Sequence, residues 1–177
     1  MMGACRLLMI DKKGGGQRPI AIGHIYRRLA GRFLERTSRK SLIEAFGPKQ
    51  MATQPNGTST AAPSMQINIE THSEHVLVAM DCSNAFTSAW RSVLLRWLIK
   101  LTPWNFSYAK TFYNSPAMLW VVQAQKEEDK FIWSSEGTQQ GCPLDMTMFC
   151  AGMISIIQGA EKLHILLWTW ELIKFPL

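Results

Sequence analysis

The sequence contains no closely spaced pair of cysteines. Its four cysteines stand singly, and even Cys142 and Cys150 are too far apart for the C-x-x-C spacing of a zinc knuckle. We therefore expect neither a disulfide framework nor a structural zinc site. Cysteines without such a pattern fit a reducing compartment best, so we expect an intracellular protein, without distinction between nucleus and cytoplasm.

Long hydrophobic runs are also missing. No apolar segment reaches the ~18 residues that span a bilayer, and no basic stretch precedes the short apolar run near residue 8, as it would in a signal peptide. We therefore expect no membrane partner. Hydrophobic residues still make up 47% of the 177 residues and charged residues 18%. This composition excludes disorder throughout and predicts one domain, or two lobes that share a core.

Acidic residues are scarce in the first third of the chain. Residues 1–60 contain 11 Lys and Arg but only 3 Asp and Glu, whereas residues 61–177 contain 8 and 10. The net charge of +6 at pH 7 therefore lies at one end of the chain. Such asymmetry favours a polyanionic partner, nucleic acid or an anionic membrane, over a small acidic substrate. A solvated basic helix is the alternative that charge alone leaves open.

Hydrophobic periodicity and turn residues predict alternating strands and helices. The stretch 47–64 is expected to be a loop, because it is rich in Gly, Pro, Ser and Thr. The expected elements are a strand hairpin over 6–23, a helix over 24–46, a strand over 76–80, helices over 90–101 and 103–114, a hairpin of 118–123 with 131–135, and a helix over 143–163.

Asp81 follows the apolar run Val76–Met80 directly. A carboxylate at the end of a buried strand is unfavourable unless it is paired, so Asp81 is either a structural cap or part of a metal site. Metal-assisted phosphoryl transfer would suit it, because its carboxylate and the carbonyl of Cys82 are hard oxygen ligands. Five residues on, the ring of Phe86 could lie under a nucleotide sugar and exclude a 2′-hydroxyl, although an ordinary core aromatic is the alternative.

Two glycine-containing stretches add to this pattern. In "EGTQQGCPLDM" the glycines allow the backbone to approach a ligand, and Gln139 or Gln140 could contact a nucleotide or a template. In "DKKGGGQRP" the side chains of Lys12, Lys13 and Arg18 sit on a hairpin short enough to close over a triphosphate. A simple hairpin turn is the alternative for the second stretch.

At these residues the sequence resembles reverse transcriptases, most closely the RNA-directed DNA polymerases of non-LTR retrotransposons. The fingers motif K-x-G-G-x-R-P-I is matched by Lys12–Ile20. The motif D-x-x-N-A-F-N-x-x-x-R is matched by Asp81–Arg91, with Thr87 in place of the second Asn, and G-x-x-Q-G-x-P-L by Gly137–Leu144. The resemblance covers roughly residues 6–155, with the three motifs in the order of the family.

The resemblance implies a set of roles. Asp81 would be the catalytic carboxylate and, with the carbonyl of Cys82, a ligand of Mg²⁺, while Phe86 would be the steric gate. It further implies an RNA template, a DNA primer and deoxynucleoside triphosphates as partners. The remaining implied residues are Lys12, Lys13, Arg18, Gln140 and Gly141 for the nucleotide, and Arg27, Arg28, Arg32 and Arg36 for the nucleic-acid backbone.

The Tyr-x-Asp-Asp motif of the family is absent, and no aspartate follows Asp145. Two-metal catalysis needs carboxylates from both motifs, so we expect a fragment that is inactive alone. The expected fold is α+β: a fingers-like region over 1–75, a partial palm of a right-hand polymerase with an incomplete sheet over 76–160, and a divergent tail over 161–177. The alternatives are a non-catalytic nucleic-acid-binding module and the product of a decayed reading frame.

Overall fold

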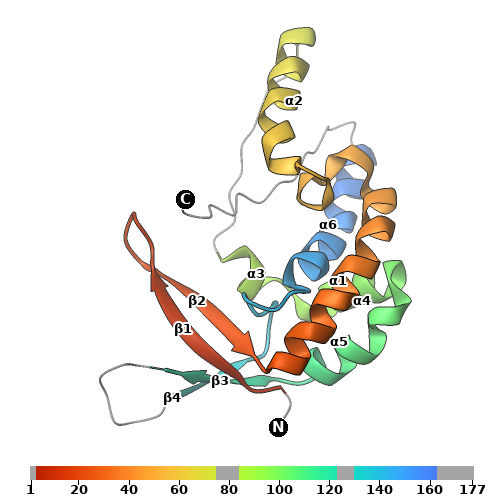
Figure 1. Ribbon diagram of the computed structural model, residues 1–177. Coiled ribbons are helices and arrows are strands. Elements are labelled where there is room, and N and C mark those ends of the chain that lie inside the picture. The colour runs from red at the N-terminus through yellow and green to blue at the C-terminus, as the bar shows by residue number, and fades with distance from the viewer. Residues whose placement is uncertain (1–2, 75–83, 123–129, 163–177) are drawn as a thin grey trace.

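The computed structural model describes residues 3–74, 84–122 and 130–162. Figure 1 shows a helical body from which a strand hairpin and one helix, α2, project. This mixture of strands and helices confirms the expected α+β class. The described elements are β1 (Cys5–Asp11), β2 (Gln17–Gly23), α1 (Ile25–Phe46), η1 (Gly47–Lys49), η2 (Met51–Thr53), α2 (Gly57–Thr71), α3 (Ala85–Ser88), α4 (Arg91–Leu101), η3 (Pro103–Asn105), α5 (Phe106–Tyr113), β3 (Ala117–Val121), β4 (Lys130–Ser134) and α6 (Asp145–Lys162).

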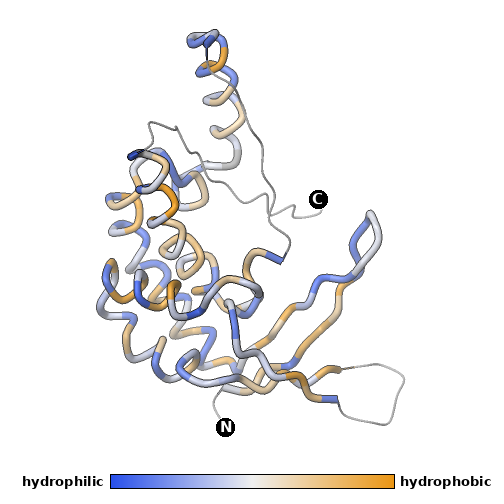
Figure 2. The backbone as a smooth tube through the Cα atoms, turned by 180° about the vertical axis from the view of Figure 1, so that it is seen from behind, coloured by the Kyte–Doolittle hydropathy of each residue, from blue (hydrophilic) through white to orange (hydrophobic). Residues whose placement is uncertain are grey.

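β1 and β2 form the projecting hairpin. They are antiparallel, with Cys5 opposite Gly23 at the base. At the tip, the Lys12 N–H donates to the Gly16 carbonyl and the Gly15 N–H donates to the Lys12 carbonyl, both at 3.0 Å. Figure 2 shows that hydrophobic residues follow the strands while hydrophilic residues gather toward the tip. The predicted hairpin is confirmed.

β3 and β4 extend the same sheet, whose strand order is β2-β1-β3-β4. β3 lies parallel to β1, with Cys5 opposite Leu119 and Leu7 opposite Val121. β4 pairs antiparallel with β3, which confirms the second predicted hairpin. The sheet therefore joins strands from both sides of the domain boundary expected near residue 75.

The main core lies between α1, α4 and α6. Leu42 from α1, Leu98 from α4 and Met148 from α6 are completely or almost completely buried. On α4, Leu94 and Leu98 are both buried and lie one helical turn apart, as the predicted amphipathic pattern requires. A smaller apolar cluster on the sheet consists of Cys5, Leu7 and Ala21.

The prediction of a loop over 47–64 is wrong in its second half. η1 and η2 occupy its beginning, but α2 starts at Gly57 and continues through Pro63. Proline removes one helical hydrogen bond, to the carbonyl four residues earlier. Pro63 is exposed, so water can hydrate the Ser59 carbonyl that it leaves without its usual helical partner. Composition alone therefore predicts a loop at positions where the chain forms a helix.

The helices predicted over 24–46, 90–101, 103–114 and 143–163 are confirmed as α1, α4, η3 with α5, and α6. The strand predicted over 76–80 and the tail beyond residue 162 lie outside the described residues. No helix within 3–74, 84–122 and 130–162 has the length and apolarity of a bilayer span.

Candidate functional site

One arginine, Arg91, fixes the loop that connects β4 to α6. Its guanidinium donates to three carbonyl oxygens at 3.0–3.1 Å, those of Ser134, Glu136 and Gly137. Its backbone N–H donates to the Glu136 carboxylate at 3.1 Å. The side chain is buried, and this burial lowers the pKa of Arg91. Three bonds from one planar group hold the loop in a single conformation.

Two backbone hydrogen bonds join this loop to α3 and to Ala89, the residue that follows it. The Gly137 N–H donates to the Ala89 carbonyl at 2.8 Å, and the Thr138 N–H donates to the Phe86 carbonyl at 2.7 Å. Gly137 has φ of 61°, and a Cβ there would overlap the backbone of Phe86 and Thr87. Only glycine fits both conditions, so this position lets two of the sequence motifs meet through their backbones.

The same loop also lies against β2. The Ala21 N–H donates to the Gln140 carbonyl at 2.6 Å. The next residue, Gly141, has φ of 106°, and a Cβ there would lie 2.8 Å from the Ala21 carbonyl oxygen. Gln140 and Gly141 are thus seated on β2, and all three motif regions meet at one place.

Asp145, the first residue of α6, holds the end of this loop through hydrogen bonds to backbone N–H groups. Its carboxylate accepts from the Gly141 N–H at 3.3 Å and from the Met146 N–H at 2.6 Å. Burial raises the pKa of Asp145 to about 6, although both N–H donors act in the opposite direction. The side chain therefore supports the backbone conformation at Gly141.

The residues predicted to contact a triphosphate lie on the β1–β2 hairpin. Lys12 and Lys13 are exposed at its tip, and Arg18 is partly exposed on β2, opposite Ile10. Arg18 shares β2 with Ala21, the residue that holds the Gln140 loop. One strand therefore connects the predicted triphosphate residues to the predicted nucleotide or template residues.

Phe86 is 6% exposed, and its ring centre lies 4.9 Å from that of Phe149 on α6. This packing agrees with the ordinary core aromatic that the sequence left open, and the steric-gate role stays a prediction. Asp81 and Cys82, the implied metal ligands, lie outside the described residues. Within the described parts of the chain, no three His, Cys, Asp or Glu side chains come together as a metal site would require.

Arg27 does not share the exposed surface of its neighbours. It is 4% exposed, and it donates to the sulfur of Cys5 at 3.0 Å, so the prediction that it contacts a nucleic-acid backbone does not fit its position. Its guanidinium lies 4.6 Å from the ring centre of Phe112 and 5.3 Å from that of Tyr113. Burial alone would lower the pKa of Arg27, but the surrounding tyrosine and cysteine side chains raise it instead.

The buried Arg27 belongs to a polar cluster that sequence reasoning missed. The Cys5 thiol donates to the Gln139 side-chain oxygen at 3.2 Å, and Tyr108 Oη lies 3.1 Å from Cys142 Sγ. A helical wheel carries the signal that could have found this arrangement, because Arg27, Gly31 and Leu42 lie on one stripe of α1. The cluster connects β1, α1, α5 and the glutamine motif.

The other three arginines predicted to contact nucleic acid lie on the solvent side of α1. Arg32 and Arg36 are exposed, and Arg28 is partly exposed. They recur every fourth residue, so they form one row along the helix. This row is a cationic surface that fits the expected polyanionic partner.

Comparison with solved structures supports a polymerase fold. Apo telomerase from Candida tropicalis, truncated from its C-terminal domain, is similar with a TM-score of 0.56 and 12% sequence identity over 93% of this chain. At that identity the likeness shows the fold alone. This chain spans 40% of that telomerase chain. The chain therefore has an α+β fold similar to that of this telomerase chain.

A family model described as reverse transcriptase (RNA-dependent DNA polymerase) matches residues 10–169. Because the match covers most of the chain, the protein belongs to the reverse transcriptase family. The family implies a nucleic-acid template and, in general, divalent metal ions. No curated protein matches the sequence.

Proposed function

We propose that this chain is the fingers and partial palm of a retrotransposon-type RNA-directed DNA polymerase, which binds template and nucleotide but does not extend primers alone. The observation that carries the proposal is the backbone contact between Gln140 and Ala21. It brings the glutamine motif onto the strand that bears Arg18. Membership of the reverse transcriptase family supports the proposed reaction class, RNA-directed DNA synthesis.

The proposed roles follow from these positions. Lys12, Lys13 and Arg18 bind the triphosphate of an incoming deoxynucleotide, since cationic side chains on an exposed hairpin can reach its oxygens. Gln140 and Gly141 place the nucleotide or the template base. Phe86 is proposed as the gate against a 2′-hydroxyl, which requires its ring to become accessible when the nucleotide binds.

The reaction of the family is attack by a primer 3′-oxygen on the α-phosphate of a deoxynucleotide. When bound, Mg²⁺ would stabilise charge on the attacking and leaving oxygens. The ligands proposed for it are the Asp81 carboxylate and the Cys82 carbonyl. No aspartate follows Asp145 in the sequence, so the second carboxylate motif has no counterpart here, and this is why we propose that the chain is inactive alone.

Primer extension tests the inactivity. The purified chain would be incubated with an RNA template, a DNA primer, deoxynucleotides and Mg²⁺, and we expect no extension above the level of the Asp81→Asn variant. Extension by the wild-type chain that Asp81→Asn abolishes would contradict inactivity and would assign Asp81 its catalytic role.

Binding tests the template and nucleotide roles separately. We expect the chain to bind a labelled RNA–DNA template–primer at low salt and to lose affinity steeply as salt rises. Deoxynucleotide binding should weaken in Lys13→Glu and Arg18→Glu, whereas Arg96→Glu, an equal charge change at an exposed site on α4, should leave it unchanged. Absence of binding to any nucleic acid at low salt would overturn the proposed function.

A second candidate is a non-catalytic nucleic-acid-binding module. The observation that favours it is the row of Arg28, Arg32 and Arg36 on the solvent side of α1, which does not depend on the nucleotide site. Template binding without any deoxynucleotide binding would select this candidate.

A further inference from the structure

The outer face of α1 carries two neighbouring stripes, one hydrophobic and one basic. Ile25, Leu29 and Phe33 recur every fourth residue and lie in one row, with Tyr26 beside it. These four side chains are 53%, 57%, 68% and 75% exposed, respectively. The row of Arg28, Arg32 and Arg36 borders them.

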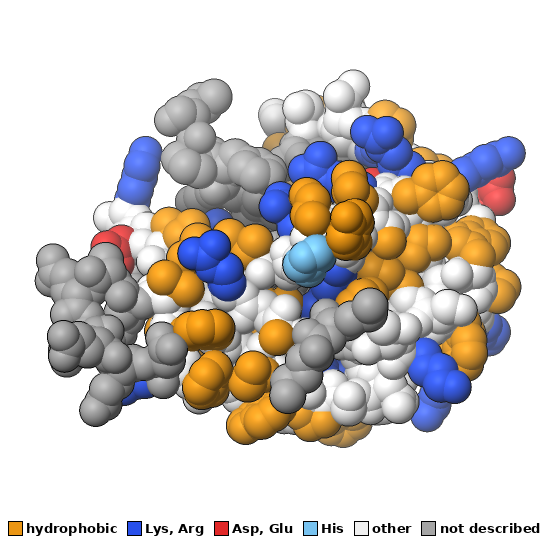
Figure 3. All heavy atoms as spheres, turned by 60° about the horizontal axis from the view of Figure 1, so that its bottom comes forward, with side chains coloured by type: hydrophobic (Ala, Val, Ile, Leu, Met, Phe, Trp, Pro, Cys, Tyr) orange, Lys and Arg blue, Asp and Glu red, His pale blue; other side chains and the backbone are white. Residues whose placement is uncertain are grey.

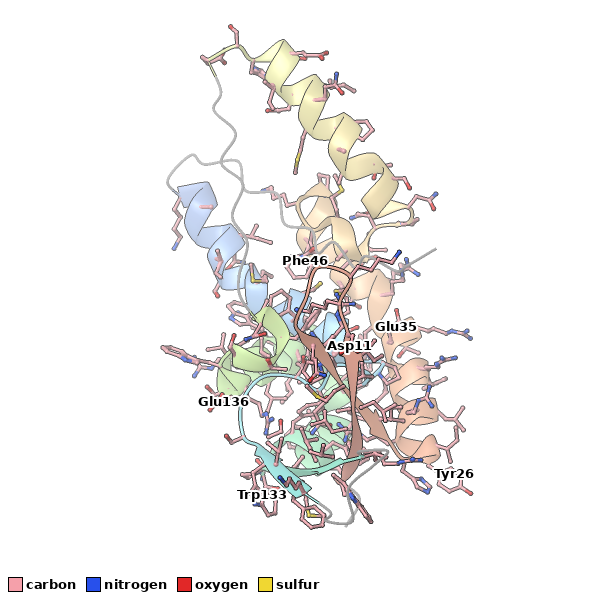
Figure 4. The ribbon with its side chains drawn as sticks, turned by 90° about the vertical axis from the view of Figure 1, so that its left-hand side faces the viewer. Asp11, Tyr26, Glu35, Phe46, Trp133 and Glu136 are labelled. Carbon is pink, nitrogen blue, oxygen red and sulfur yellow. The ribbon has the colours of Figure 1, made fainter. Side chains whose placement is uncertain are left out.

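The hydrophobic stripe lies on the solvent-exposed side of α1 and does not pack into the core of the protein. The residues of α1 that pack inward lie on the opposite side of the helix, and Figure 4 shows Tyr26 on the outer side of α1, directed away from the body. The ring centre of His24 lies 5.2 Å from that of Tyr26, with the two ring planes tilted by 38°, which adds a second aromatic ring beside the stripe. Figure 3 shows hydrophobic and basic side chains intermingled on the end of the molecule that comes forward there.

We propose that this face binds an unpaired, single-stranded segment of nucleic acid. Bases stack on Tyr26 and Phe33, and the arginine row holds the phosphates between them. Proteins that bind single strands combine the same two parts, an aromatic platform and a cationic track. The inference rests on the proposed function, because it names the form of nucleic acid that the fingers take up.

A duplex fits the face less well than a single strand. In a duplex the bases are stacked inside, and a protein that contacts only phosphates has no use for exposed hydrophobic side chains. An unpaired strand presents base faces and phosphates side by side. The aromatic side chains of Phe33 and Tyr26, with the neighbouring row that contains Arg28 and Arg32, match that combination.

A second copy of the chain is disfavoured by charge. Each copy carries +6, and Glu35 is the only acidic residue between His24 and Lys40, so two such faces would repel each other. A membrane surface is disfavoured by geometry. A helix that lies in a bilayer interface buries an apolar face opposite a face of Lys and Arg. Here the hydrophobic stripe covers only Ile25 to Phe33, the first part of a helix that continues to Phe46, so little of α1 could enter a membrane.

The test compares single-stranded and duplex binding by the whole chain. The probes are a labelled oligouridine of about 15 nucleotides, which fits the site sizes of single-strand binders, and an RNA duplex of the same length. We expect the Tyr26→Ala, Phe33→Ala double variant to bind the single strand at least roughly tenfold more weakly. Its affinity for the duplex should stay within about twofold of wild type, because phosphate contacts remain.

Two control variants separate stacking from other effects. Tyr26→Phe with Phe33→Tyr keeps both rings and should retain single-strand binding. Trp133→Ala removes an equally exposed aromatic from β4 (63% exposed) and should leave binding unchanged. Circular dichroism and thermal unfolding of all variants should match the wild type, because the changed side chains are exposed.

Several outcomes would overturn the inference. They are an unchanged single-strand affinity in the double variant, an equal loss for strand and duplex, or a loss of similar size in Trp133→Ala. If the double variant lost affinity only for phosphatidylserine vesicles, the face would be assigned to a membrane. If the wild-type chain formed a dimer in sedimentation and the double variant did not, the face would be assigned to a second copy. A wild-type chain that binds neither nucleic acid would contradict the proposed function itself, whereas binding that ignores Tyr26 and Phe33 would contradict only this inference.

Discussion

At Gly137 a hydrogen atom in place of a side chain lets two distant parts of the sequence share hydrogen bonds. Its N–H reaches Ala89, its carbonyl accepts from Arg91, and its φ of 61° lies in the left-handed region. The first glycine of the G-x-x-Q-G motif, Gly137, is thus required by the backbone conformation of this fold, independently of any role in ligand binding.

Replacement of Gly137 by alanine should destabilise the chain. The left-handed conformation alone should cost an alanine about 1–2 kcal/mol, and the overlap of its Cβ with Phe86 and Thr87 adds to this. Urea unfolding should show a lower midpoint with an unchanged slope. In the matched variant Gly159→Ala, on α6, the new methyl group meets no atom within 4 Å, so a gain of roughly 0.5–1 kcal/mol is expected. Equal stability of Gly137→Ala and wild type would contradict the geometry.

Residue identities predicted the motif positions well but the buried arginines badly. Arg27 and Arg91 are only 4% and 5% exposed, although a charged side chain such as arginine is ordinarily expected on the surface. Their burial depends on partners from other elements: Cys5 and two rings for Arg27, and the loop carbonyls for Arg91. A helical wheel places Arg27 on the inward stripe of α1, but it does not name the partners, because these come together only in three dimensions.

Among the elements, α2 is where local composition and structure disagree most. It has a proline at its seventh position and few buried side chains. A helix with little packing depends on its own propensity, and proline in a helix interior is unfavourable by roughly 3 kcal/mol relative to alanine. α2 should therefore be the least stable of the long helices.

Pro63→Ala should slow the opening of α2. The substitution restores a backbone N–H that can donate to the Ser59 carbonyl, so hydrogen exchange in the amides of Gly57–Thr71 should become slower, and circular dichroism should report more helix. Ser64→Ala, one residue further on, changes side-chain propensity alone and should have a much smaller effect. Exchange as fast as in the wild type would show that Pro63 does not limit this helix.

Both strand hairpins were predictable from alternation and turn residues, because each is formed by neighbours in the sequence. The pairing of β1 with β3 was not, since no local pattern states which strand lies beside which. The same holds for the contact of Gln140 with Ala21, which joins two stretches far apart in the sequence.

At the scale of the whole molecule, the sheet and the helical core are joined at several points. β1 pairs with β3, Arg27 of α1 contacts Cys5 of β1, and the Arg91 loop connects β4 to α6. Parts that share buried contacts of this kind unfold together in small domains.

We expect one cooperative unfolding transition for the isolated chain. Far-UV circular dichroism, which reports mainly on helices, and tryptophan fluorescence, to which Trp120 and Trp133 of the sheet contribute, should give the same midpoint in urea. Coincidence of the two curves would also count against the product of a decayed reading frame. Separate midpoints would show that the sheet is not held by the helical core.

The parallel pairing of Cys5 with Leu119 joins two strands that are synthesised at different times. β1 leaves the ribosome before α1, α2, α4 and α5, yet its neighbour in the sheet, β3, is made only after them. Until then one edge of the β1–β2 hairpin stays open to other chains. Long-range pairing of this kind folds slowly, so a nascent chain that stalls before β3 should be the form most prone to aggregate.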